Sequence, residues 1–253
     1  MATVAEPRPS AGNLRSLARK YLYPSTASVM LLMMLWGFRN YYLHGHAAGD
    51  QIIAPAMARL DAVHGSALTA WVGLFFVQTP LVASNRRDWH KVLGWCSLAV
   101  AATVFTSGTV VAVESVRNTP GFVFFGMDYR LFLLVMLVEM AAFATFVVLA
   151  VIQRKRPQRH RAMMLMATLS IIAGSTARMP GLAPYFGDSG WSGLFGAVTL
   201  LGAVVLSLRS LIDRKLDRWM AWGLVGMSGA FALAIQASNT EAWDKVASSV
   251  FGV

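Results

Sequence analysis

Charged residues and cysteine are the two things that this sequence has least of. Asp, Glu, Lys and Arg make up only 13% of the 253 residues, whereas a soluble domain carries roughly 25%. So few charges leave too little polar surface to cover a globule in water, and 56% of the residues are hydrophobic. The one cysteine, Cys96, lies in an apolar run and has no intramolecular disulfide partner. The composition therefore predicts a protein whose solvent is lipid.

The motifs of soluble enzymes are absent as well. The sequence holds no phosphate-binding glycine loop, no zinc-finger spacing and no Gly-x-Ser-x-Gly motif. The first 25 residues contain no apolar stretch of the kind that a cleavable signal peptide needs. A net charge of +10 is compatible with nucleic-acid binding, but the basic residues stand in short blocks between apolar runs. We therefore expect the bilayer as the partner and no nucleic acid.

Seven apolar segments remain, each close to the ~20 residues that cross ~30 Å of hydrocarbon as an α-helix. They are residues 26–43, 62–83, 91–113, 131–152, 162–182, 191–208 and 219–236. None has an internal lysine, which excludes a retinal Schiff base. The sequence thus predicts an all-α bundle of seven transmembrane helices in one domain, residues 26–236. A mobile basic tail of residues 1–25 precedes the bundle, and a short external tail of residues 237–253 follows it.

The loops between these segments differ sharply in basic residues. The N-terminal tail and residues 84–91, 153–161 and 209–218 hold sixteen Lys and Arg residues, whereas the alternate loops and the C-terminal tail hold five. Loops rich in Lys and Arg stay in the cytoplasm. The N-terminus is therefore predicted to be cytoplasmic and the C-terminus outside, in a cell membrane that we take to be a bacterial inner membrane. The cytoplasmic side should bind anionic lipid headgroups.

Ionisable residues inside the predicted helices are the first candidates for function. A charge at the centre of a membrane helix costs at least about 2.5–3.5 kcal/mol, so such residues usually have a purpose. Glu139 lies about 12 Å from the outer end of its segment at 1.5 Å per residue, and Arg178 lies about one turn below the outer end of the next segment. We expect both to face the bundle interior, close together, as part of an intramembrane polar cluster with Gln78. The alternative is that Glu139 and Arg178 only hold the bundle together.

A second group of polar residues follows one face of the second predicted helix. Asp61 and His64 are three residues apart and share a helical face, which continues through Trp71 and Gln78. Such a stripe must face protein or water rather than lipid.

His44 and His46 come shortly before this helix, near the same membrane surface. Together with Asp61 and His64 they form a set with the ligand types of zinc, iron or copper. One hypothesis is therefore a metal site on the outer face. The alternative is a group of polar interfacial residues without a metal.

Two further histidines, His90 and His160, stand at the predicted cytoplasmic ends of the third and fifth helices. With His46 and His64 at the outer side, the chain offers a histidine pair near each face. Two b-type haems, each held by two imidazoles, need such an arrangement to pass electrons across a membrane. The alternative is that His90 and His160, which stand among arginines, are anchors for anionic phospholipids.

Three short motifs are shared with known sequences. His64-Gly65 opens the second apolar segment, Gln78-x-x-Leu81-Val82-Ala83 ends it, and His90-Lys91-x-Leu93-Gly94 opens the third. In these motifs, and over roughly residues 36–182, the chain resembles a family of uncharacterised bacterial multi-pass membrane proteins. The resemblance implies a multi-pass fold and no particular reaction. The histidine placement also resembles, more loosely, that of multi-helix b-type cytochromes.

Three classes of function follow from these patterns. The first is a haem-binding or redox membrane protein that uses His46, His64, His90 and His160. The second is a metal-dependent membrane hydrolase that acts at the outer leaflet through a site with zinc or another transition metal. The third is a transporter, a sensor or an accessory subunit of a membrane complex without a metal, either as a single chain or as a homo-oligomer. Absorption spectroscopy and metal analysis of the purified protein separate them.

Overall fold

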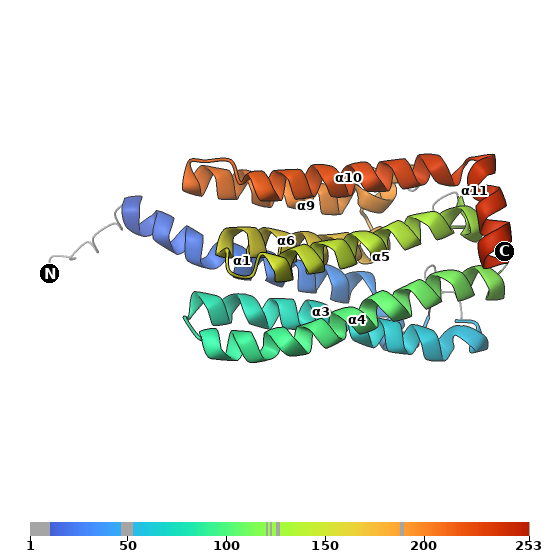
Figure 1. Ribbon diagram of the computed structural model, residues 1–253, viewed down its shortest axis with the longest axis horizontal. Coiled ribbons are helices and arrows are strands. Elements are labelled where there is room, and N and C mark those ends of the chain that lie inside the picture. The colour runs from blue at the N-terminus through green and yellow to red at the C-terminus, as the bar shows by residue number, and fades with distance from the viewer. Residues whose placement is uncertain are drawn as a thin grey trace, which may run out of the picture.

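The computed structural model describes residues 11–46, 53–119, 121, 123–124, 127–187 and 190–252. Its long helices lie side by side along one axis of the molecule (Figure 1). They are α1 (Ala11–Gly37), α3 (Pro55–Ala83), α4 (Arg87–Asn118), α5 (Tyr129–Ile152), α6 (Pro157–Ile171), α9 (Gly190–Asp213) and α10 (Arg218–Ser238).

Short elements connect these helices. They are α2 (Arg39–His44), the strands β1 (Val123–Phe124) and β2 (Met127–Asp128), α7 (Ala173–Ala177), α8 (Ala183–Phe186), α11 (Glu241–Val246) and the π-helical turn η2 (Ala247–Phe251). The two strands pair in antiparallel fashion, with Val123 opposite Asp128 and Phe124 opposite Met127. The start of α1 and the C-terminal α11 lie at opposite ends of the long axis (Figure 1).

Local sequence signals explain where several helices begin. Pro55 and Pro157 occupy the first turns of α3 and α6, where a missing N–H costs nothing. Asp128 and Asp217 cap α5 and α10, since their side chains accept hydrogen bonds from the backbone N–H groups of Leu131 and Met220. These starts set the register of the side chains that each helix turns toward the bundle interior.

Five of the described helices are long and apolar enough to cross a membrane: α3, α4, α5 from Arg130 on, α9 and α10. They correspond to five of the seven predicted segments, and the structure is that of an α-helical membrane protein. The other two segments look different. α1 carries Arg15, Arg19 and Lys20 among the apolar residues before Val29. The predicted segment 162–182 is interrupted at Ile172, which separates the fifteen-residue α6 from the short α7.

The described parts of both predicted tails are largely helical. α1 begins at Ala11 rather than near residue 26, because its first half is held in place: Arg19 Nε lies 2.9 Å from Asp213 Oδ1 of α9, and Tyr23 is buried. Residues 1–10 of the predicted tail lie outside the described residues.

At the other end of the chain, α11 and η2 fold across the ends of α4 and α5. Arg130 at the start of α5 forms an ion pair with Asp244 at 3.1 Å. Arg117 of α4 donates a hydrogen bond to the carbonyl oxygen of Phe251 at 2.7 Å. The predicted C-terminal tail is therefore a packed element. We use the term "α11 end" for this end of the bundle.

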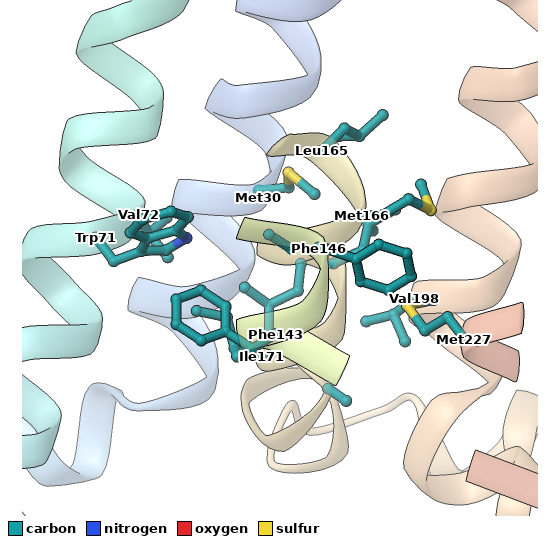
Figure 2. Close-up of a cluster of buried hydrophobic side chains, with 14 of the residues drawn as sticks. Met30, Trp71, Val72, Phe143, Phe146, Leu165, Met166, Ile171, Val198 and Met227 are labelled. Carbon is teal, nitrogen blue, oxygen red and sulfur yellow. The ribbon is translucent and has the colours of Figure 1, made fainter. Parts of the chain in front are cut away.

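One apolar core joins helices from all parts of the chain. Figure 2 shows ten of its side chains, contributed by α1, α3, α5, α6, α9 and α10: Met30, Trp71, Val72, Phe143, Phe146, Leu165, Met166, Ile171, Val198 and Met227. Trp71 is only 2% exposed, and its ring packs edge-on against that of Phe143 with centroids 4.9 Å apart. This core fills the middle of the bundle, whereas the space toward the α11 end is hollow.

Candidate functional site

A cavity of about 670 Å³ opens in the half of the bundle nearer the α11 end. Its wall is formed by α1, α2, α3, α4, α5, α7 and α9 and by the hairpin before α5. Five of the residues singled out from the sequence line it: His46, Asp61, His64, Glu139 and Arg178. The lining also holds four flexible methionines, Met34, Met57, Met136 and Met140. The cavity thus combines a polar part with adaptable apolar side chains.

Arg178 belongs to the polar part of the lining. Its guanidinium carbon lies 5.1 Å from the ring centre of Phe38 and 5.0 Å from that of Phe124, within the range of a cation–π interaction. Its Nη1 donates a hydrogen bond to the carbonyl oxygen of Gly174 at 2.6 Å. The guanidinium is therefore fixed between two aromatic rings at the end of α7.

Glu139 and Asp61 reach the same cavity from two different helices, α5 and α3. The charge of Arg178 interacts electrostatically with the carboxyl groups of both. Both side chains are partly buried and open onto the cavity. The structure thus places Glu139 and Arg178 at one internal surface, and it adds Asp61 to them.

His64 lies one helical turn after Asp61 and contacts α4. Its Nδ1 is 3.0 Å from the hydroxyl oxygen of Ser107, and that hydroxyl donates its own hydrogen to the carbonyl of Thr103 at 2.5 Å. A hydroxyl has one hydrogen to donate, so we assign the ring proton to His64 Nδ1. His64 Nε2 is then left with its lone pair. Gly108 leaves room for this imidazole, because a Cβ at position 108 would lie 2.8 Å from His64 Cε1.

The set proposed for a metal is only partly gathered. The rings of His44 and His46 lie 6.0 Å apart, but His44 is exposed and does not line the cavity that holds the other three residues. Within the described ranges, no group of three or more His, Cys, Asp or Glu side chains is arranged to hold a metal ion. Residues 47–52, which connect His46 to α3, lie outside those ranges.

Two further predicted residues meet at the opposite end of the bundle. His90 of α4 and His160 of α6 approach each other with ring centroids 6.3 Å apart. His160 Nδ1 lies 2.9 Å from the carbonyl oxygen of Ala150, to which it donates. Gln78 of α3 contacts His90 Nδ1 with its amide nitrogen and accepts a hydrogen bond from Gly94 N at 3.0 Å.

These bonds fix opposite tautomers in the two imidazoles. The amide N–H of Gln78 donates to His90 Nδ1, so the ring proton of His90 is on Nε2. His160 donates from Nδ1 and keeps a lone pair on Nε2. The two rings thus belong to polar contacts between α3, α4, α5 and α6. Gln78 belongs to these contacts and not to the cluster of Glu139 and Arg178.

The arginines near this histidine pair also have intramolecular contacts. The guanidinium of Arg159 stacks on Trp219 at 4.5 Å, and that of Arg161 lies 5.4 Å from the ring centre of Tyr23. These two arginines therefore help to hold α1, α6 and α10 together. The prediction that this end binds lipid headgroups stays a prediction.

A third polar contact lies between the two ends of the bundle. Trp71 Nε1 donates to Thr168 Oγ1 of α6 at 3.2 Å, inside the apolar core. The polar face of α3 therefore has a partner at each level: Ser107 for His64, Thr168 for Trp71, and His90 for Gln78.

Sequence reasoning missed the aromatic residues around Arg178. Phe38 lies between α1 and α2, and Phe124 lies in the hairpin before α5. Neither is distinguishable from an ordinary apolar residue in the sequence. Only the path of the chain brings them to the same guanidinium.

Comparison of the chain with protein-family models, with curated proteins and with solved structures finds no match. The fold and the site are therefore interpreted from their own geometry, and the resemblance to a bacterial multi-pass family stays a hypothesis.

Proposed function

We propose that this protein is a seven-span membrane protein, with a cytoplasmic N-terminus and an external C-terminus, that binds an amphipathic small molecule in its outer half as a transporter or a sensor. The observation on which this rests is one cavity that brings Asp61, His64, Glu139 and Arg178 together with many apolar side chains. Of the three classes of function considered from the sequence, this is the third.

The basic residues support the orientation. Sixteen of the 22 Lys and Arg residues stand in the N-terminal tail and in alternate loops, which favours the cytoplasm for those segments. α1 and the pair α6–α7 would supply the two crossings beyond the five long apolar helices, since both lie among the other helices of the bundle (Figure 1). In this orientation the α11 end is the outer end, and the cavity opens in the outer half.

The lining supports an amphipathic ligand. Small-molecule sites are concave and mostly apolar, with a few converging polar groups that fix orientation. Here the polar groups converge from α3, α5 and α7, and the apolar part of the lining includes Leu68 and Val72 of α3. A ligand of this shape has an apolar body and one polar head.

The proposal is tested by native mass spectrometry of the protein purified from its own membrane. Leu68→Trp adds bulk inside the cavity, and Val77→Trp adds the same bulk on the exposed face of the same helix, where Val77 is 42% exposed. We expect wild type and Val77→Trp to retain a bound molecule that Leu68→Trp has lost. If all three proteins give the same spectrum, the cavity is not a ligand site.

The haem and metal hypotheses are tested separately. A Soret band in the purified protein that is lost in His90→Ala and His160→Ala would support haem binding at the inner end. Stoichiometric zinc that is lost in His64→Ala would support the outer metal site. Neither result is expected from the proposed function.

A further inference from the structure

The polar residues of the lining offer hydrogen-bond acceptors that the described part of the chain leaves without donors. The side chains of Asp61 and Glu139 accept no hydrogen bond from any described residue; what reaches them is the electrostatic influence of Arg178. His64 adds a third acceptor, because its Nδ1 is used by Ser107 and Nε2 keeps its lone pair. Partly buried acceptors need donors, and an ionised carboxylate can only accept.

The charges that line the cavity also favour a ligand that donates hydrogen bonds. Two carboxyl groups are close to one fixed cation, Arg178. The other charged residue that the described part of the chain contributes to the lining, Arg39, is turned toward Trp36, where its Nη1 donates to the backbone carbonyl at 3.3 Å. When both carboxyl groups are ionised, the charge of Arg178 balances only one of them, and Arg39 is the second cation that the described residues contribute to the lining.

We propose that the polar head of the ligand is a protonated amine, which binds between Asp61, Glu139 and His64 in place of a proton. This inference rests on the proposed function and names the ligand class for the same cavity. An ammonium group has three donors and no acceptor, which matches the three acceptors, and its apolar body would lie along the methionines of the lining. Binding to a protonated cavity would release one proton.

The described residues bring a limited set of other titratable groups to the cavity that Glu139 lines, including Arg39 and Tyr42. α3 contributes Asp61 and His64, and the end of α7 contributes Arg178. On the α1–α2 side, Tyr41 donates its hydroxyl to the backbone carbonyl of Asp61 at 3.3 Å, and His46 follows α2. The parts of α4, α1 and α9 that line the cavity contribute no titratable side chain. Competition between amine and proton is therefore expected at the two carboxyl groups.

The test compares two compounds of the same shape and opposite charge, 1-adamantylamine and 1-adamantanecarboxylate, by calorimetric titration of the full chain in nanodiscs. Heats from empty nanodiscs are subtracted. We expect the amine to bind more tightly than the carboxylate. Its affinity should rise with pH by up to about tenfold per pH unit while a carboxyl group is being ionised, because the amine itself stays protonated over this range.

Variants assign the effect to the cavity. Glu139→Gln and Asp61→Asn should weaken amine binding and flatten its pH dependence. Glu114→Gln is the matched control, since Glu114 pairs with Arg117 at 2.8 Å and does not line the cavity, and it should bind as wild type does. The comparison of the two compounds on wild type decides the sign of charge even if a variant fails to fold.

Equal or tighter binding of the carboxylate would overturn the proposal and would mean that Arg178 selects an anion. It would leave the proposed function intact. Absence of amine binding to a protein that retains a molecule in native mass spectrometry would also overturn the ligand class, but not the site. If no molecule is retained either, the proposed function itself fails.

Discussion

Arg178 shows how one side chain can determine the chemistry of a cavity in lipid. Its guanidinium is held by Phe38, Phe124 and the carbonyl of Gly174, so it cannot follow a ligand out of the site. The two carboxyl groups near it gain a fixed positive neighbour. Removal of that neighbour leaves them in an apolar environment with no cation beside them.

The first prediction compares Arg178→Ala with Glu139→Gln. We expect Arg178→Ala to lower the stability of the folded protein by about 3 kcal/mol, and Glu139→Gln by only about 1 kcal/mol, because the amide keeps the shape of the side chain and needs no cation. The loss in Arg178→Ala should shrink at acidic pH, where the carboxyl groups can take up protons.

Thermal unfolding in nanodiscs at acidic and at neutral pH measures both effects. A Glu139→Gln variant that is less stable than Arg178→Ala would show that the carboxylate, and not the guanidinium, organises the site.

The sequence was informative about which residues matter and less so about their partners. Glu139, Arg178, Asp61 and His64 stand out because a polar group in an apolar segment is costly, and the structure brings all four to one cavity. Gln78 stands out for the same reason, but it lies with His90 at the other end. The spacing of polar residues in a sequence shows that they share one face of a helix. It does not show which neighbouring helix contacts each of them.

At the scale of elements, the close approach of α1 to α7 shapes the cavity wall. A Cβ on Gly37 would overlap the backbone oxygen of Ser175. Backbone atoms cannot move aside as a flexible side chain can, so only glycine lets the end of α1 pack this closely. The contact holds α7, and with it Arg178, against the rest of the bundle.

The second prediction concerns this contact. Gly37→Ala should destabilise the protein by about 1–3 kcal/mol through overpacking, and it should displace Arg178 and so weaken ligand binding. Gly226→Ala is the control, since a Cβ at Gly226 of α10 has no neighbour within 4 Å.

Unfolding temperature and amine affinity are measured on both variants. If Gly37→Ala is as stable as Gly226→Ala and binds the amine normally, the close approach does not position the site.

The apolar pattern predicted the existence of the long helices far better than their ends. Five of the seven predicted segments correspond to helices that are long and apolar enough to cross a membrane. The break at Ile172 and the helical start at Ala11 were not predicted. After the break, α7 contacts α1 and α9, and in the first part of α1 Arg19 forms an ion pair with Asp213. Such contacts join residues far apart in the sequence, which a local pattern does not register.

At the scale of the whole molecule, the two ends of the bundle differ in chemistry. The end with His90 and His160 is closed by polar bridges between helices and by stacked arginines. The α11 end contains the cavity and is bordered by α11 and η2, which Arg117 and Arg130 tie to α4 and α5. The proposed binding site therefore lies at one end of the bundle, and the basic loops favour the exterior for that end.

The third prediction concerns adjacent cysteines on α4, each introduced in a Cys96→Ser background that removes the only native cysteine. Val111 lines the cavity, whereas its neighbour Val110 is 45% exposed on the outer surface of the bundle. Both lie at nearly the same depth, since one residue advances a helix by about 1.5 Å. Only a thiol in contact with water is ionised enough to react quickly with a maleimide.

The most direct test is labelling of intact cells with a membrane-impermeant maleimide. The account predicts that Val111→Cys reacts from outside without permeabilisation, that an excess of 1-adamantylamine slows this reaction, and that Val110→Cys stays unlabelled. Labelling of Val111→Cys only after the cells are opened, or equal labelling at the two positions, would contradict a ligand cavity that opens to the exterior.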